Sequence, residues 1–174
     1  MKRLFFIVIL ISGCILLGEK RAYTLTPLFN RDYEQKVLEL INSAQYSIHI
    51  AMFVMKRYDK GVNELIDALC EKALSGVDVK VILEFDYDSS VVRTNTPAYE
   101  YLKLNNVQVR KDPIGICTHT KLIIIDGEKV IIGSTNWTYS ALYENNETSV
   151  LIEDKDFARE CENYFNDLWN ISRD

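Results

Sequence analysis

Two short apolar segments on either side of a turn signal constrain the fold of this chain more than any other feature. The segments TKLIII and KVIIG are rich in β-branched residues, and Asp126 and Gly127 lie between them. An Asp-Gly pair is typical of a tight turn between two antiparallel strands. With these two residues at the centre of the turn, Ile125 faces Glu128. We therefore expect a β-hairpin over residues 117–136.

The open end of this hairpin collects polar side chains. Counting back from the turn places His119 opposite Ser134. The same count places Cys117 opposite Asn136. His119 and Lys121 are two residues apart, so their side chains project from the same face of the strand. A cation, a nucleophile and two hydrogen-bonding side chains therefore converge, and this pattern predicts a functional site.

The order of apolar patterns along the chain predicts an α/β fold, in which helices flank one mixed β-sheet. We expect Asn30 to cap the first helix, Thr96 and Pro97 to begin the third, and residues 86–96 to form a polar loop. The last helix is expected to bury Tyr164 among its apolar residues. The expected strands are 23–28, 46–55, 77–85, 107–110 and 147–152, and the expected helices are 30–44, 59–74, 96–105 and 154–170.

Size and charge narrow the class of protein. The chain has 174 residues, which is typical of a single domain. Its formal net charge is −5, and without Lys2 and Arg3 it is −7. This acidic balance argues against a basic surface that covers the whole fold and holds duplex nucleic acid. A local basic cluster remains available at Lys56, Arg57 and Lys60.

The first 18 residues differ sharply from the rest, because two positive charges precede a long apolar run. This pattern predicts that residues 1–18 are a signal peptide or an uncleaved membrane anchor. The sequence ISGC, which ends at Cys14, also resembles a bacterial lipobox and leaves a lipoprotein as a third alternative. In each case the charge distribution favours a domain on the periplasmic or extracellular side of a membrane. Residues 19–29 are then expected to form a linker with a first strand, and residues 30–174 to form the main domain.

The hairpin matches the signature HxKxxxxDxxxxxxGSxN and therefore resembles the phospholipase D superfamily, and Glu147 follows where that family has an acidic residue. The resemblance covers roughly residues 25–170 and is nearest to single-motif members such as the Nuc-like endonucleases. Anchored cardiolipin hydrolases are a second resemblance. The resemblance to the superfamily implies a phospholipase D-like αβα sandwich and phosphodiesterase activity. It also implies that neither a cofactor nor a metal is needed. Asp126 is mainly structural in the family, which agrees with its place in the turn. The implied site residues are His119, Lys121, Asp126, Ser134, Asn136 and Glu147.

The chemistry gives each implied residue a task. A phosphodiester anion repels nucleophiles, so its site must neutralise the phosphate and supply a nucleophile better than water. The resemblance implies that the imidazole of His119 attacks phosphorus and forms a phosphohistidine. Lys121 and Asn136 are expected to donate to the non-bridging oxygens, and Ser134 to add a hydrogen bond. Glu147 is expected to accept a hydrogen bond from the second ring nitrogen of His119 and to fix its tautomer.

The leaving oxygen needs a general acid, which later serves as the base for water. Family enzymes use a histidine from a second copy of the motif, whereas this chain has one motif and two histidines, His49 and His119. The resemblance therefore implies a homodimer in which each protomer gives His119 to one shared site. His49 lies in an apolar strand and is expected to be a buried, hydrogen-bonded histidine. Cys117 is expected to be a small apolar filler.

The substrate class stays open between two alternatives. The length of the chain and its lack of insertions favour an endonuclease that cleaves DNA or RNA, which is the preferred interpretation. An acidic domain held at a membrane favours a phospholipase that acts on phospholipid, for instance cardiolipin. A third alternative is an inactive, membrane-tethered scaffold, against which the complete set of motif residues argues. The aromatic residues Trp137, Tyr139 and Tyr143 suit base stacking, an acyl pocket or core packing.

Overall fold

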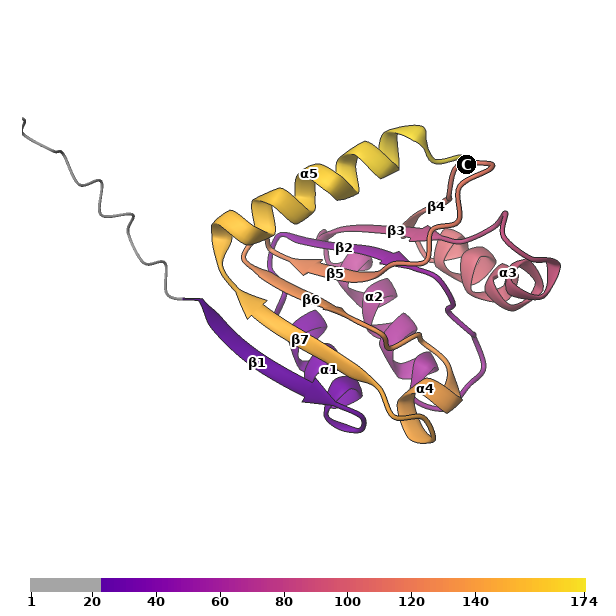
Figure 1. The fold of residues 1–174 in the computed structure, drawn as a ribbon. Helices are drawn as coiled ribbons and strands as arrows, with labels where there is room; N and C mark the ends of the chain where they lie inside the picture. Colours follow the sequence, from indigo (N-terminus) through magenta and orange to yellow (C-terminus); the bar gives the residue numbers. More distant parts are fainter. Residues whose placement is uncertain (1–22) are drawn as a thin grey trace, which may run out of the picture.

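The computed structural model describes residues 23–174 (Figure 1). The segment predicted to be a signal peptide or anchor, and the first residues of the predicted linker, lie outside this range. Within residues 23–174, no helix combines the length and apolar character that a bilayer-spanning helix needs.

A mixed sheet of seven strands forms the centre of the described chain, which confirms the predicted fold class. The strand order is β1-β7-β6-β5-β2-β3-β4. Strands β2, β3 and β4 run parallel, and the other neighbours pair antiparallel. The strands are β1 Thr24–Phe29, β2 Ser47–Met52, β3 Asp78–Leu83, β4 Gln108–Lys111, β5 Lys121–Ile125, β6 Lys129–Gly133 and β7 Thr148–Glu153.

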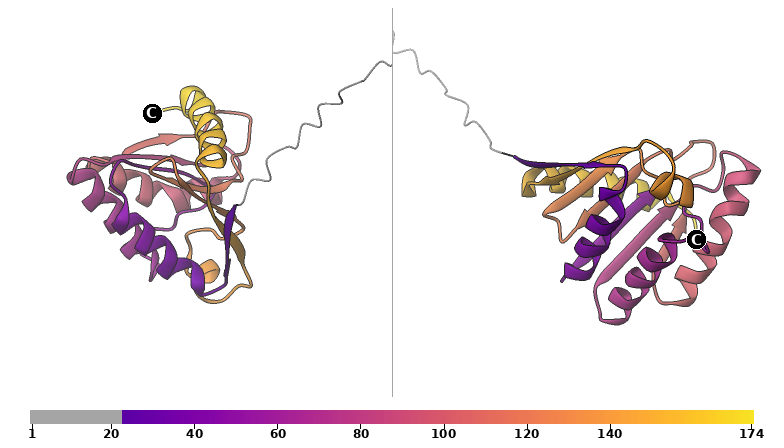
Figure 2. Two further views of the ribbon diagram at one scale, coloured as in Figure 1. Left: turned by 90° about the vertical axis from the view of Figure 1, so that its left-hand side faces the viewer. Right: turned by 90° about the horizontal axis from the view of Figure 1, so that it is seen from below.

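Helices cover both faces of this sheet (Figure 2). Helices α1, α2 and α3 lie on one face and enclose the larger apolar core with one side of the strands. Helix α5 crosses the other face, where Phe165 and Leu168 pack on apolar residues of the central strands. The helices are α1 Asp32–Ser43, α2 Val62–Leu74, α3 Ser89–Leu104, α4 Tyr139–Tyr143 and α5 Lys155–Ile171.

The turn between β5 and β6 forms where the sequence predicts it, but the predicted register is wrong by one residue. Asp126 and Gly127 have positive φ angles of 53° and 61°. The amide of Glu128 donates to the carbonyl oxygen of Ile125 over 3.0 Å. The ladder nevertheless pairs Ile125 with Lys129, because Glu128 is accommodated as an extra residue after the turn. A one-residue shift changes every facing pair along a hairpin, so His119 does not face Ser134.

Three further predictions from the sequence are wrong. Residues 86–96 are mostly helical, because α3 begins at Ser89 with Asp88 as its N-cap, and Pro97 lies inside the helix. Arg31, rather than Asn30, is the N-cap residue of α1. Tyr164 on α5 is 53% exposed, because the next residue, Phe165, lies on the buried face of that helix and Tyr164 does not.

The topology brings the ends of several strands together at one end of the sheet, which is the edge that runs across the strands. Strand β5 is antiparallel to β2, and Lys121 at its beginning pairs with Met52 at the end of β2. The carboxyl ends of the parallel strands, the open end of the hairpin and the start of β7 therefore share this edge. In open α/β sheets, ligands bind in the crevice at this kind of edge.

Candidate active site

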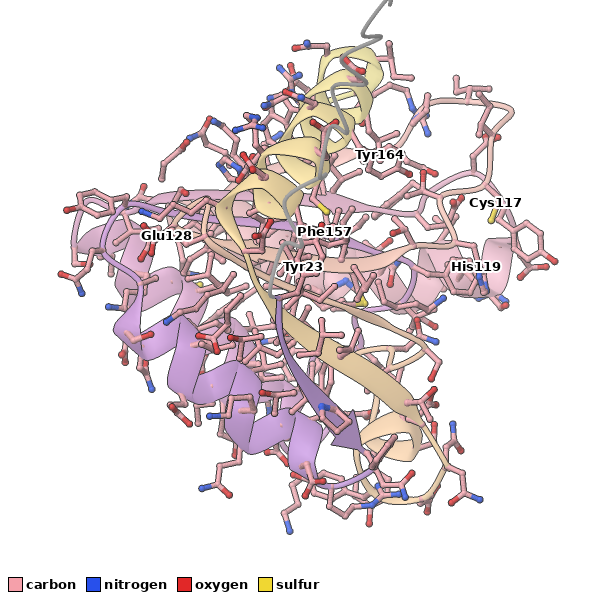
Figure 3. All side chains as sticks on the ribbon, turned by 60° about the vertical axis from the view of Figure 1, so that its left-hand side comes forward. Tyr23, Cys117, His119, Glu128, Phe157 and Tyr164 are labelled. Atoms are coloured by element: carbon pink, nitrogen blue, oxygen red, sulfur yellow. The ribbon has the colours of Figure 1, made fainter. Side chains whose placement is uncertain are left out.

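His119 lies in the loop just before β5, and its side chain is exposed. Figure 3 shows His119 beside Cys117, at the end of the hairpin that is distant from Glu128. The Nζ atom of Lys121 lies 3.3 Å from Nδ1 of His119 and donates to the His119 carbonyl oxygen over 2.8 Å. The ring of Phe53 packs against the imidazole with centroids 4.3 Å apart. An exposed imidazole is thus held between an aromatic ring and an ammonium group.

Lys121 is the cation of this site, and its side chain is largely buried although it carries a charge. Only 7% of the residue is exposed, and its Nζ atom lies 4.7 Å from the centre of the Phe53 ring. Burial lowers the pKa of Lys121 below the ordinary lysine value, while the nearby Cys117 and Glu147 oppose this shift. A partly desolvated ammonium interacts strongly with an anion, because little water screens the charge.

Ser134 and Glu147 meet on the β6–β7 side of the site. The Ser134 hydroxyl donates to one carboxylate oxygen of Glu147. The side-chain amide of Asn145 donates to the other oxygen over 3.0 Å. The predicted hydrogen bond between Glu147 and His119 is not formed within residues 23–174, where Ser134 and Asn145 are the side chains that donate to the Glu147 carboxylate. The Ser134 hydroxyl also accepts from the backbone amide of Thr148 over 3.0 Å.

Asn30 holds the backbone of Glu147, a role that the sequence does not suggest. Its Oδ1 atom accepts from the Glu147 amide over 2.8 Å, and its own amide donates to the Glu147 carbonyl oxygen over 3.0 Å. Asn30 has a φ of 50°, which asparagine tolerates better than most residues. The residue read as a helix cap therefore connects the start of α1 to the acidic residue of the site.

Asn136 is partly buried, and its Oδ1 atom has no hydrogen-bond partner among the described residues. The next residue, Trp137, fixes this part of the chain. Trp137 is fully buried, its indole nitrogen donates to the Tyr33 hydroxyl over 3.2 Å, and its amide donates to the Val54 carbonyl oxygen over 2.9 Å. Of the three expected roles for this tryptophan, core packing is confirmed.

Asp126 lies at the other end of the hairpin and faces backbone. Its carboxylate accepts hydrogen bonds from the amides of Gln45, Tyr46 and Ser47 at 2.7–3.2 Å. Burial alone would raise the pKa of Asp126, but these three donors hold it below the ordinary value. The carboxylate thereby fastens the turn to the loop that precedes β2.

Two residues outside the motif, His49 and Cys117, have clear environments in the structure. His49 is buried on the α5 side, where Nδ1 lies 2.7 Å from Glu162 and Nε2 lies 3.3 Å from Asp78, so the prediction of a satisfied buried histidine is confirmed. Cys117 is exposed, and the prediction of an apolar filler is wrong because the loop before His119 lies outside the sheet.

The predicted basic cluster is largely neutralised. Lys56 pairs with Asp59 over 3.1 Å, and Arg57 pairs with Asp67 over 3.1 Å while stacking on Tyr101. Phe53 is a further residue that sequence reasoning passed over. An apolar strand such as YSIHIAMFVM gives no sign of which member leaves the core at the strand end.

A comparison with known proteins places this geometry in a family. The family model described as "Cardiolipin synthase, PLD-like domain" matches residues 37–169. Phospholipase D of Rickettsia prowazekii is 33% identical over 135 residues, which are 74% of this chain and 59% of that protein. Cardiolipin synthase A of Serratia proteamaculans is 28% identical over 126 residues, 72% of this chain. The chain spans about a quarter of the length of that synthase, 26%.

Among solved structures, the phospholipase D family member Nuc from Salmonella typhimurium superposes with a TM-score of 0.76. It is 26% identical, and the match covers 88% of this chain and 98% of that chain. The family model and this fold, taken with the motif at the open end of the hairpin, show that the chain belongs to the phospholipase D superfamily as a Nuc-like, PLD-like domain.

Proposed function

We propose that this chain is a metal-independent phosphodiesterase that acts through a phosphohistidine intermediate. The observation that carries the proposal is the exposed imidazole of His119 beside the desolvated ammonium of Lys121, 3.3 Å away. One group supplies a nucleophile and the other supplies positive charge where a phosphate would gain negative charge.

The reaction needs two displacements at phosphorus. In the first, a ring nitrogen of His119 forms a bond to phosphorus, and the bond to the leaving oxygen breaks as that oxygen takes a proton. In the second, water loses a proton and attacks phosphorus, and the bond to His119 breaks. Lys121 and the amide of Asn136 stabilise the non-bridging oxygens in both steps. Ser134 would add a hydrogen bond to the phosphate, and Glu147 lies near enough to Lys121 to favour its charged form.

The proton for the leaving oxygen requires a second acid, and we propose that it is His119 of a second copy of this chain. Histidine suits this task because its ordinary pKa lies near neutrality. His49 cannot serve, because it is buried on the α5 side of the sheet. A twofold homodimer would bring two copies of the exposed loop together around one phosphate. Sedimentation analysis checks this step: an active protein that stays monomeric at assay concentration contradicts it.

For the substrate we favour DNA or RNA. The likeness to Nuc covers 98% of that structure and 88% of this chain. Phospholipid is the second candidate, and it is favoured by similarity to a phospholipase D and to cardiolipin synthases. We also propose that residues 1–18 anchor or export the domain, which would place it at a membrane or outside the cytoplasm.

A side-by-side assay separates these alternatives. The domain from residue 23 onward is incubated with single-stranded DNA, with RNA and with vesicles that contain cardiolipin, in the presence of EDTA. We expect cleavage of nucleic acid, and a loss of about 10³-fold or more in His119→Asn, which keeps size and polarity but removes the nucleophile.

Cleavage of lipid alone would replace the substrate and keep the mechanism. Activity that disappears in EDTA and returns with a divalent cation would contradict the mechanism itself. Turnover of no phosphodiester by a folded protein would favour an inactive scaffold.

A further inference from the structure

His119 is not held by the sheet, although the proposed reaction needs it in a fixed place. Strand β5 begins only at Lys121, so the residues just before it lack ladder partners. Two hydrogen bonds of the backbone replace the ladder. On one side of His119, the Phe53 amide donates to the Thr120 carbonyl oxygen over 3.0 Å. On the other side, the Thr118 amide donates to the carboxylate of Glu84.

Glu84 follows β3 directly and is completely buried, with 0% of the residue exposed. Its Oε1 atom accepts from the amides of Asp86 over 2.7 Å and Tyr87 over 2.6 Å. Its Oε2 atom accepts from the amide of Thr118. One side chain thus gathers three backbone donors from two loops, and none of these donors has a partner in a strand.

A second buried carboxyl group, Asp112, lies against Glu84. Asp112 follows β4, is 0% exposed, and accepts from the amides of Phe85 over 2.8 Å and Thr118 over 3.3 Å. Burial and a hydrogen bond with Glu84 raise the pKa of Asp112 to about 6. Burial of Glu84 also opposes its charge, but hydrogen bonds from Asp112 and the backbone amides hold the pKa of Glu84 below its ordinary value.

The charged groups around this pair are few. The Arg173 side chain approaches from the chain end, where Nη2 lies 3.9 Å from Oδ1 of Asp112 and Nε donates to the Asp112 carbonyl oxygen over 2.7 Å. The other ionisable side chains of these two loops are Asp86, Tyr87, Asp88, Cys117 and His119. Two adjacent buried carboxyl groups cost free energy that apolar side chains would not. Their contribution is therefore the set of acceptors that they offer to the loop backbone.

We infer that Glu84, supported by Asp112, is the positioning residue for His119. The buried carboxylate fixes the Thr118 amide, and the adjacent imidazole is thereby held against Phe53 and Lys121. This inference rests on the proposed function of His119 as the nucleophile. Glu84 touches neither the imidazole nor a substrate, so it acts through the backbone alone.

Glu84→Gln tests the inference. Glutamine has nearly the same shape, but its amide nitrogen would face a backbone donor and leave at least one of the three amides without an acceptor. We expect kcat on a small chromogenic phosphodiester to fall about 10–100-fold, because a misplaced nucleophile reacts slowly even when the substrate binds. KM is expected to stay within about twofold, because Lys121 and Asn136 still hold the phosphate. Glu100→Gln on the exposed side of α3 is the matched control and should leave both constants unchanged.

Amide hydrogen exchange in the unaltered protein gives a second measurement that needs no variant and no activity. The Thr118 amide should exchange at least about 100-fold more slowly than the amide of exposed Ile116, because a closed hydrogen bond in a buried place protects it. In Glu84→Gln, this protection should be lost while the amides of β5 keep theirs.

The outcomes separate this inference from the proposed function. If Glu84→Gln retains the kcat of Glu100→Gln, or if the Thr118 amide exchanges as fast as that of Ile116, the positioning role is wrong. If KM rises and kcat is unchanged, Glu84 supports substrate binding instead. If the unaltered protein cleaves no phosphodiester yet protects Thr118, the proposed function fails and the placement of the loop stands.

Discussion

The two ends of the β5–β6 hairpin use motif residues in opposite ways. At the turn, both carboxylate oxygens of Asp126 accept hydrogen bonds from the backbone amides before β2. At the open end, the imidazole of His119 is exposed, and the ammonium of Lys121 lies 3.3 Å from its Nδ1 atom. The same short motif therefore holds the turn in place at one end and carries the groups that we propose to react at the other. Substitutions at the two ends should separate stability from activity.

Among the substitutions that test this contrast, the largest effect is expected from Lys121→Met, which keeps an unbranched side chain of nearly the same length and removes its charge. We expect kcat/KM to fall about 10²–10³-fold, because charge on the phosphate is no longer compensated in a partly desolvated site. Folding should be retained, since methionine suits a buried position against Phe53. Steady-state kinetics and thermal melting measure the two quantities.

The pH profile provides the internal check for Lys121. Because burial lowers its pKa, the alkaline limb of activity should lie below the ordinary lysine value of 10.5. An activity that is constant up to that pH would show that the ammonium does not take part.

The second effect is expected from Asp126→Asn, at the turn. The variant should lose about 1–3 kcal/mol of unfolding free energy, because fewer of the three backbone amides keep an acceptor. Its folded fraction should retain kcat, and that result would sharpen the contrast between the two ends. Glu128→Gln in the same turn is the control, because it removes only an exposed ion pair with Lys155.

Acid should affect Asp126 in a definite direction. Its folded pKa is below the ordinary value of 3.8, so its contribution to stability is present above that value and is lost as pH falls through the folded pKa. Urea unfolding near pH 3 and at pH 6 should therefore show a smaller difference for Asp126→Asn than for the unaltered protein. If Asp126→Asn lost as much kcat as Lys121→Met, the contrast between the two ends of the hairpin would be wrong.

The smallest effect is expected from Asp112→Asn, and it has the opposite sign in pH. Because the folded pKa of Asp112 is about 6, the folded state keeps a proton that the unfolded state releases near pH 4. Stability from this group therefore falls as pH rises from about 4 to about 6 and is constant above that. Its size is on the order of 1 kcal/mol, since the lowered pKa of Glu84 offsets part of it.

Asparagine cannot titrate, so Asp112→Asn should flatten this decline, as urea unfolding at pH 4.5 and 7 would show. Glu100→Gln again serves as the control. A decline that is equally steep in both variants would mean that the buried pair does not hold the proton.

The order and class of the elements follow from the sequence because burial on a sheet leaves a clear apolar record. The strand YSIHIAMFVM and the hairpin are both central in the sheet, as their continuous apolar character predicts. The sequence does not indicate the start of α3, because the first turns of this helix are largely polar. The buried Asn95, which hydrogen-bonds to the Phe53 and Glu84 carbonyl oxygens, anchors that helix without adding to an apolar pattern.

The site shows the same division. The motif places His119 and Lys121 together, since their spacing is local and the strand enforces it. The register across the hairpin was misjudged, because one extra residue after the turn cannot be seen in the turn sequence itself. The supports of the site, Asn30, Phe53 and Glu84, come from segments distant along the chain. Their roles depend on contacts between loops, for which a single sequence has no periodic signal.

The loop between Asp112 and Thr118 is attached at both ends and by the Gly115 amide, which donates to Asp86, while Ile114 and Ile116 are 70% and 62% exposed. This segment lies next to the candidate active site, and its exposed residues are not needed to hold the sheet together. We expect its exposed side chains to tolerate substitution while the histidine that follows keeps its place. Substrate preference in an engineered or diverging descendant of this chain would therefore be cheapest to change here, without disturbing the chemistry.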